Sequence, residues 1–402
     1  MAHVLALSDY WWGWLGLGFR WLHVIAAMAW IGASFYFIAL DNHLERPKDP
    51  ADSRRGVMGE AWEIHGGGFY RVEKFRVAPE RLPQTLHWFK WEAYTTWLSG
   101  FALFIVVYYA HASTFLIDPS VASLTPAEAI LLSIAGLVIA WLVYDALCRT
   151  IGQRSEVALA ACVLGLTTLA AWGASQLFAP RAAYLQVGAM LGTIMAANVF
   201  FVIIPAHWEL VRAKEAGREP DPAANLRGKQ RSVHNNYLTL PVLFTMLAAH
   251  FPFTYGHDHA WAILVALMVI GAWVRLYFNQ RHAGRTLWWI PVTAAAGIAA
   301  VAVWIRPAPP APTAGATKVT FAQVQPVVAQ RCAACHSQHP TLVSAAPLGI
   351  VLETAAQIHA QAARIKAVAV DTHVMPLGNA THMTDAERQL LAAWIAQGAK
   401  TP

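Results

Sequence analysis

Eight long apolar segments constrain the fold of this chain more than any other feature. They are near the length of about 20 residues that a helix needs to cross a bilayer. The chain is 57 % apolar and 13 % charged, and its 18 tryptophans suit aromatic belts at two membrane surfaces. We therefore predict an all-α fold, with an eight-helix transmembrane bundle over residues 1–305. The segments are 14–40, 91–112, 127–147, 156–178, 184–207, 233–251, 260–280 and 287–305.

The basic residues are distributed unevenly between the loops. The loops that follow the first, third, fifth and seventh segments hold almost all of them, whereas the alternate loops hold only Arg181. Such an asymmetry marks the cytoplasmic side of a membrane protein. The formal charge of +6 is thus a topology signal, and no nucleic-acid partner is expected. The pattern predicts a multi-pass protein of the bacterial inner membrane, in contact with lipid and with both termini in the periplasm.

A C-x-x-C-H motif lies beyond the last apolar segment. Cys332 and Cys335 have the spacing that attaches a haem c covalently, and His336 follows as the proximal ligand of the iron. The alternative is half of a zinc site, but no second Cys/His pair at zinc spacing follows. Met375 is the predicted sixth ligand, in a loop where a thioether can reach the iron. Met383 and His373 are its rivals.

The flanks of this motif fit a class I cytochrome c domain over residues 318–402. Thr320 with Gln323, and Thr384 with Glu387, have the spacing of capping boxes that open helices. The second of these helices is predicted over 385–397. A Pro/Ala-rich linker, 306–317, separates the domain from the bundle. Because c-type haem is attached in the periplasm, the motif and the charge pattern predict the same topology.

The loop after the first apolar segment is long and patterned. Residues 62–65 and 69–77 alternate in polarity on either side of three glycines at 66–68, which indicates a β-hairpin.

Histidines in or beside the spans fall into two layers. An outer pair, with His23 preferred, could ligate a b-type haem; the alternative is hydrogen bonding between helices. The inner layer could form a polar pocket for an anionic planar substrate, although its basic residues could equally just fix the topology. The predicted catalytic residues are His65, His87, Glu92, His234 and Asn235.

The chain resembles the bacterial membrane-bound, cytochrome-c-linked urate oxidases, also called urate hydroxylases. The likeness rests on the segments 63–70 (EIHGGGFY), 86–97 (LHWFKWEAYTTW) and 234–237 (HNNY), and on eight spans joined to a C-x-x-C-H domain. Separately, the helix around His23 looks like the first helix of a membrane family that includes haem-binding protoporphyrinogen oxidases and copper-resistance proteins.

The resemblance implies oxidation of urate to 5-hydroxyisourate without hydrogen peroxide. Water would supply the hydroxyl group, and electrons would leave through haem c to a soluble cytochrome c or a terminal oxidase. Two other functions fit the residues: a quinol-oxidising cytochrome b/c, and a haem or copper transporter with a tethered redox-sensing cytochrome. About 30 Å of hydrocarbon is long for one electron hop, so a second relay is expected.

Overall fold

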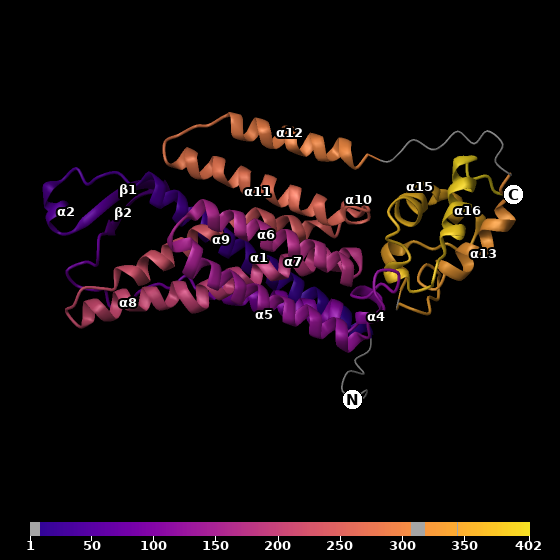
Figure 1. The fold of residues 1–402 in the computed structure, drawn as a ribbon, viewed down its shortest axis with the longest axis horizontal. Coiled ribbons are helices and arrows are strands. Elements are labelled where there is room, and N and C mark those ends of the chain that lie inside the picture. The colour runs from indigo at the N-terminus through magenta and orange to yellow at the C-terminus, as the bar shows by residue number, and fades with distance from the viewer. Residues whose placement is uncertain (1–8, 307–317, 344) are drawn as a thin grey trace.

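A computed structural model describes residues 9–306, 318–343 and 345–402. Figure 1 shows an elongated bundle of helices with a smaller helical body at one end. The predicted linker, 306–317, lies outside the described residues except for Arg306, and the predicted domain limits stay predictions.

Helices build almost all of the bundle. The long ones are α1 (Asp9–His43), α3 (Trp91–Phe104), α5 (Pro126–Thr150), α6 (Glu156–Leu177), α7 (Pro180–Asn198), α8 (Ile204–Glu215), α9 (Pro222–Ala248), α11 (Ala260–His282) and α12 (Trp289–Trp304). Short elements between them are α2 (Pro50–Arg54), η1 (Ile105–Tyr109), α4 (Ala112–Phe115), η2 (Ile151–Gln153), η3 (Val199–Ile203) and α10 (Pro252–Tyr255).

Each of the eight predicted segments overlaps one of these helices. Within the described residues, five helical stretches are long and apolar enough to cross a membrane. They are Tyr10–His43, Pro126–Gln153, Glu156–Leu177, Pro180–Glu215 and Ala260–His282. Of the other three, α3 and α12 are short, with 14 and 16 residues, and the first half of α9 is polar. Several helices could therefore span a membrane, while the count of eight stays a prediction.

Helix α7 is the centre of the bundle. It packs against α5, α6 and α9. It belongs to the apolar stretch Pro180–Glu215, and 67 % of the most apolar part of that stretch is buried. Gly188 of α7 lies so close to Thr245 of α9 that a side chain there would overlap the threonine. Small residues at helix crossings let backbones approach, and packing of this kind holds helices together in lipid.

The predicted hairpin is confirmed, and it adds two strands to a structure that is otherwise helical as predicted. Strands β1 (Val57–His65) and β2 (Gly68–Phe75) pair antiparallel. Gly66 and Gly67 make the turn with φ of 56° and 80°, a region that favours glycine. Arg71 of β2 pairs with Asp52 of α2 and with Glu60 of β1. The described part of the chain is thus mostly helical with one two-stranded sheet, at the bundle end opposite the C-terminal body (Figure 1).

The C-terminal body is a small helical unit around its own core, in which Val324, Leu391 and Trp394 are buried. Thr384 and Glu387 form the predicted capping box, and the helix that they open ends at Ala396, one residue before the predicted end. Its elements are α13 (Phe321–Arg331), η4 (Pro347–Gly349), α14 (Ala355–Ala360), α15 (Ala362–Ile365), η5 (Lys366–Asp371), η6 (Leu377–Asn379) and α16 (Asp385–Ala396).

The C-terminal unit packs on the bundle through the loop that contains Met375. Val374 is buried within the core of the bundle. A Cβ atom at Gly378 would lie 2.7 Å from the carbonyl oxygen of Ile117 and 2.9 Å from that of Thr114. This contact, near α4 in Figure 1, holds the C-terminal unit at the end of the bundle where α1 begins.

Candidate functional site

Three consecutive polar residues of α9 connect the helices of the bundle. Successive side chains on a helix point about 100° apart, so His234, Asn235 and Asn236 face three different neighbours. The run is half-buried at His234 and fully buried at the two asparagines. Polar groups inside an apolar bundle are costly unless they are paired, which makes this layer the strongest candidate for function.

His234 faces α5 and α6. Its Nδ1 lies 2.8 Å from the Tyr144 hydroxyl, and its Nε2 lies 3.3 Å from Oε2 of Glu156. The other oxygen of Glu156 accepts a hydrogen bond of 2.6 Å from Gln230. An imidazole between a hydroxyl and a carboxylate can take up and release protons.

Asn235 faces α7 and is fixed by the protein itself. It accepts a hydrogen bond of 2.9 Å from the amide of Asn198 and donates one of 3.0 Å to the Met195 carbonyl. Asn198 also donates to Tyr144 (3.1 Å) and accepts from Arg231 (3.3 Å). Arg231 is 2 % exposed and pairs with Asp145 at 2.7 Å. These bonds hold the layer rigid.

Asn236 faces α1 and α11, where the hydrogen bonding is incomplete. Its Oδ1 accepts from Nε of Arg275 (2.8 Å) and from Nδ2 of Asn279 (3.0 Å). Arg275 and Asn279 lie four residues apart, on one face of α11. Both are buried, at 3 % and 8 % exposure, yet Nη2 of Arg275 and Oδ1 of Asn279 have no hydrogen-bond partner.

Arg275 also lacks an anion. Its guanidinium carbon lies 3.8 Å from the centre of the Phe35 ring, and among the described residues no carboxylate pairs with it. A buried charge without a counter-ion is strongly disfavoured. The cluster of Asn236, Arg275 and Asn279 therefore offers a ligand one hydrogen-bond donor on the charged guanidinium and one hydrogen-bond acceptor on an amide. This combination suits a polar, anionic ligand.

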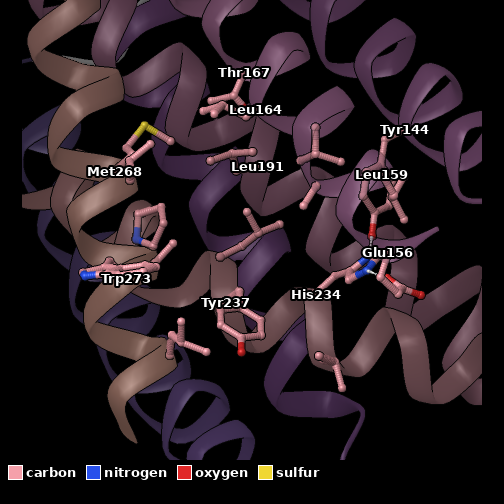
Figure 2. A pocket seen from close by; sticks show the side chains of 18 of the residues that line it. Tyr144, Glu156, Leu159, Leu164, Thr167, Leu191, His234, Tyr237, Met268 and Trp273 are labelled. Atoms are coloured by element: carbon pink, nitrogen blue, oxygen red, sulfur yellow. Dashed lines mark hydrogen bonds and ion pairs between the residues drawn. The ribbon is translucent and has the colours of Figure 1, made fainter. Parts of the chain in front are cut away.

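A cavity of about 640 Å³ lies on the His234 side of α9. Figure 2 shows Tyr144, Glu156, His234 and Tyr237 at one end and Leu164, Thr167 and Met268 toward the other. Most of the lining is apolar, and the polar side chains gather at the end near Glu156.

The other predicted catalytic residues lie elsewhere. His65 is exposed at the tip of the hairpin, and His87 is exposed in the loop before α3 with its ring against Phe89. Within the described parts of the chain, neither one bonds to His234 or Asn235. Glu92 lies in the first turn of α3, and its buried Oε2 has no hydrogen-bond partner. The structure thus brings together His234 and Asn235 of this set.

The sequence reasoning missed the cluster around Arg275. The signal was present, because Arg275 stands inside a predicted span, where an ionisable residue is by default a functional candidate. Tyr144 and Glu156 were missed as well. They lie on separate helices, and nothing local in the sequence ties them to His234.

His23, the predicted ligand of a b-type haem, packs on α3. Its Nδ1 lies 2.9 Å from the Thr96 carbonyl oxygen and 3.3 Å from the Ser99 hydroxyl. A Cβ atom at Gly100 would lie 2.7 Å from the ring, so glycine makes room for it. The bond at Nδ1 directs Nε2 toward any ligand, and the haem b stays a prediction.

The C-x-x-C-H residues form a turn after α13. The backbone N–H groups of Cys335 and His336 donate to the carbonyl of Cys332. Nδ1 of His336 lies 3.0 Å from the Ile350 carbonyl oxygen, an arrangement that leaves Nε2 for a metal. Burial, with the neighbouring Cys335, raises the pKa of Cys332 to about 11. The donor set fits a covalently attached haem c.

The two methionines that could be sixth ligands differ in their surroundings. Met383 is 4 % exposed and lies in the core of the C-terminal unit. Met375 packs at the edge of that core, and its backbone is held by Val368 and Arg388. His373 is exposed. In the portion of the chain that is described, no group of three or more His, Cys, Asp or Glu side chains could hold a free metal ion.

Comparison with known proteins gives one match. Residues 9–306 match the model of a family described as urate oxidase N-terminal. No curated protein and no solved structure matches the chain.

Proposed function

The chain belongs to the urate oxidase N-terminal family, and from this premise we propose that it oxidises urate to 5-hydroxyisourate inside the helical bundle. Water supplies the added oxygen, and no hydrogen peroxide is formed. The observation that supports this proposal most directly is the cluster of Asn236, Arg275 and Asn279, with its unpaired donor and unpaired acceptor.

Urate suits this cluster chemically. It is a planar anion at neutral pH, and its rim alternates N–H donors with carbonyl acceptors. An anionic edge offers an acceptor to Nη2 of Arg275, and a neighbouring N–H group offers a donor to Oδ1 of Asn279. Arginine is the side chain best shaped for such two-point recognition.

We propose that the general base of the reaction is one of the predicted catalytic residues. Glu92 carries a buried carboxylate oxygen without a hydrogen-bond partner, and so is free to take a proton from water or from urate. His234 is the second candidate, although Tyr144 and Glu156 already occupy its two nitrogens. Asn235 supports the layer, and His65 and His87 retain proposed roles near the cytoplasmic entrance.

The C-terminal unit is proposed to collect the electrons. A haem c held by Cys332, Cys335 and His336, with Met375 as sixth ligand, would supply a one-electron acceptor when bound. A soluble cytochrome c or a terminal oxidase is the proposed onward partner. The protein is proposed to lie in the bacterial inner membrane, with this unit and both termini in the periplasm.

A reduced-minus-oxidised spectrum of the purified full chain tests the function. We expect urate, added without oxygen, to reduce the c-type haem and to be consumed with a ratio of two electrons per urate. Haem that stays oxidised in excess urate would contradict the proposal. Reduction by a quinol and none by urate would instead favour the quinol-oxidising alternative.

A further inference from the structure

We propose that the cavity between α6, α9 and α11 binds the head group of a lipid-soluble quinone, which accepts electrons on the inner side of the bundle. The claim that urate supplies the electrons rests on the proposed function, whereas the claim that the cavity binds a quinone does not. The cavity has a polar end, an apolar body and an outer rim exposed on the bundle surface.

The shape of the cavity fits a flat ring with an apolar tail. Its volume of about 640 Å³ is in the range of sites for small organic ligands. The lining on α6 extends from Glu156 to Thr167, twelve residues that span ~16 Å along the helix. The charged side chains occupy the Glu156 end, and the rest of the lining is mostly apolar, with Thr167 and Trp273 among it (Figure 2).

The cavity reaches a surface that would face lipid. Leu164 of α6 and Val269 of α11 both line it, and each is 44 % exposed on the outside of the bundle. Both helices are among those long and apolar enough to cross a membrane. A ligand that enters between them therefore comes from the hydrocarbon phase.

The charge at the polar end selects a neutral head group. Lys229 and Glu156 both line this end, and Asp41, 3.9 Å from Lys229, is already paired with Lys74. The opposite charges of Lys229 and Glu156 therefore leave this end without net charge, with His234 and Gln230 beside Glu156. Such an end suits a neutral head group, and a quinone carbonyl only needs hydrogen-bond donors.

Donors are available at that end. Tyr237 lines the cavity, and its hydroxyl makes no hydrogen bond within the residues that the structure describes. His234 stands between Tyr144 and Glu156, and the Glu156 side chain is 63 % exposed. Glu156 can therefore exchange protons with the solvent at the end where the ligand oxygen would lie.

The chemistry balances without any other reactant. Urate and water give 5-hydroxyisourate, two electrons and two protons. A benzoquinone takes up two electrons and two protons to become the hydroquinone, so one quinone is reduced for each urate oxidised. The site would thus provide an exit for electrons that avoids crossing the full thickness of the bundle.

Binding is tested first, without urate. A decyl-substituted benzoquinone is titrated into the haem-loaded full chain in detergent. We expect one saturable site, and at least a tenfold loss of affinity in Ala272→Trp, which fills the cavity. Leu169→Trp is the matched control, because Leu169 lies on α6, is 63 % exposed and does not line the cavity. Absence of saturable binding, or equal affinity in Ala272→Trp, overturns the proposal.

Two further measurements keep the inference testable if Ala272→Trp misfolds. A photoreactive azidoquinone should label wild-type peptides from 156–167 or 265–276, and labelling elsewhere alone would refute the site. Palmitate should fail to displace the quinone, and equal competition would mean a general lipid pocket.

Electron transfer is tested next, with urate present. With no cytochrome c and no oxidase added, we expect one quinol per urate in the wild type and in Leu169→Trp, and a loss of at least tenfold in Ala272→Trp. Urate consumption with bound quinone and no quinol would overturn the acceptor role. Quinone binding without any urate oxidation would contradict the proposed function and leave the binding site standing.

Discussion

Two buried arginines, one in each part of the molecule, have opposite surroundings. Arg388 of the C-terminal unit is 6 % exposed and donates to the carbonyl oxygens of Ala369 and Met375. Arg275 of the bundle is 3 % exposed and keeps an unpaired nitrogen and no anion. The protein supplies the hydrogen-bond acceptors of Arg388, which thereby fixes the loop of the proposed sixth ligand. It leaves one donor of Arg275 without an acceptor, which is the property expected of a binding residue.

Arg231 lies between these extremes. It is as buried as Arg275, belongs to the same polar layer and also keeps an unpaired nitrogen, Nε, but Asp145 neutralises it. Neither burial nor an unpaired nitrogen by itself therefore marks a functional cation. The distinguishing feature is whether the protein supplies a partner for the charge.

The largest expected effect comes from Arg275→Met. Truncating one partner of a buried charge pair costs about 2–5 kcal/mol, so kcat/KM for urate should fall by about 30-fold or more. In the absence of urate the variant should be as stable as the wild type or more so, because an uncompensated charge is removed. Turnover and thermal unfolding are measured on the same sample. Arg227→Met, in an exposed position of α9, is the control, and a large stability loss in Arg275→Met would break the comparison.

Arg388→Met should act on stability instead. Two buried carbonyl groups would lose their donor, at about 1–3 kcal/mol each. We expect the C-terminal unit to unfold at a lower denaturant concentration. Its unfolding in the full chain is measured by haem absorbance. Arg364→Met, at an exposed position, should leave the midpoint unchanged. An unshifted midpoint in Arg388→Met would show that Arg388 is not structural.

Asp145→Asn tests the intermediate case. It leaves Arg231 buried without its anion, and we expect the free energy of unfolding to fall by roughly 2 kcal/mol. This loss is smaller than the full cost of breaking a buried ion pair, because Asp145 is partly exposed. Adding Arg231→Met to Asp145→Asn should restore part of the stability. Additive losses in this double-mutant cycle would mean that the pair is not coupled.

The smallest effect is a pH dependence at the C-terminal unit. Burial alone would raise the pKa of Glu387, but the Thr384 backbone and Arg331 outweigh it and hold the pKa below the usual value. A carboxyl group whose folded pKa is depressed stabilises the fold above its unfolded pKa and loses this contribution as pH falls through the folded pKa. Stability should thus drop as pH falls below about 4.5. In Glu387→Gln this component should vanish, and an unchanged profile would exclude the residue as its source.

Patterns confined to a few neighbouring residues were predictable. The glycine turn of the hairpin and the capping box at Thr384 depend on residues two to four positions apart, and both are confirmed. The C-x-x-C-H motif is equally local, and its attached haem stays a prediction with a fitting donor set. The fold class was predicted as all-α from the helical bulk of the chain, and the mostly helical structure agrees with it apart from the hairpin.

The amino-acid sequence by itself determined the apolar segments, the hairpin, the caps and the motif of the C-terminal unit, because each follows from spacing along the chain. Only the tertiary structure decided which polar groups meet. Asn236 and Arg275 are 39 residues apart and share a hydrogen bond because α9 and α11 pack together. Whether a buried donor finds a partner is fixed by that packing, so the unpaired edge of Arg275 could be seen only in three dimensions.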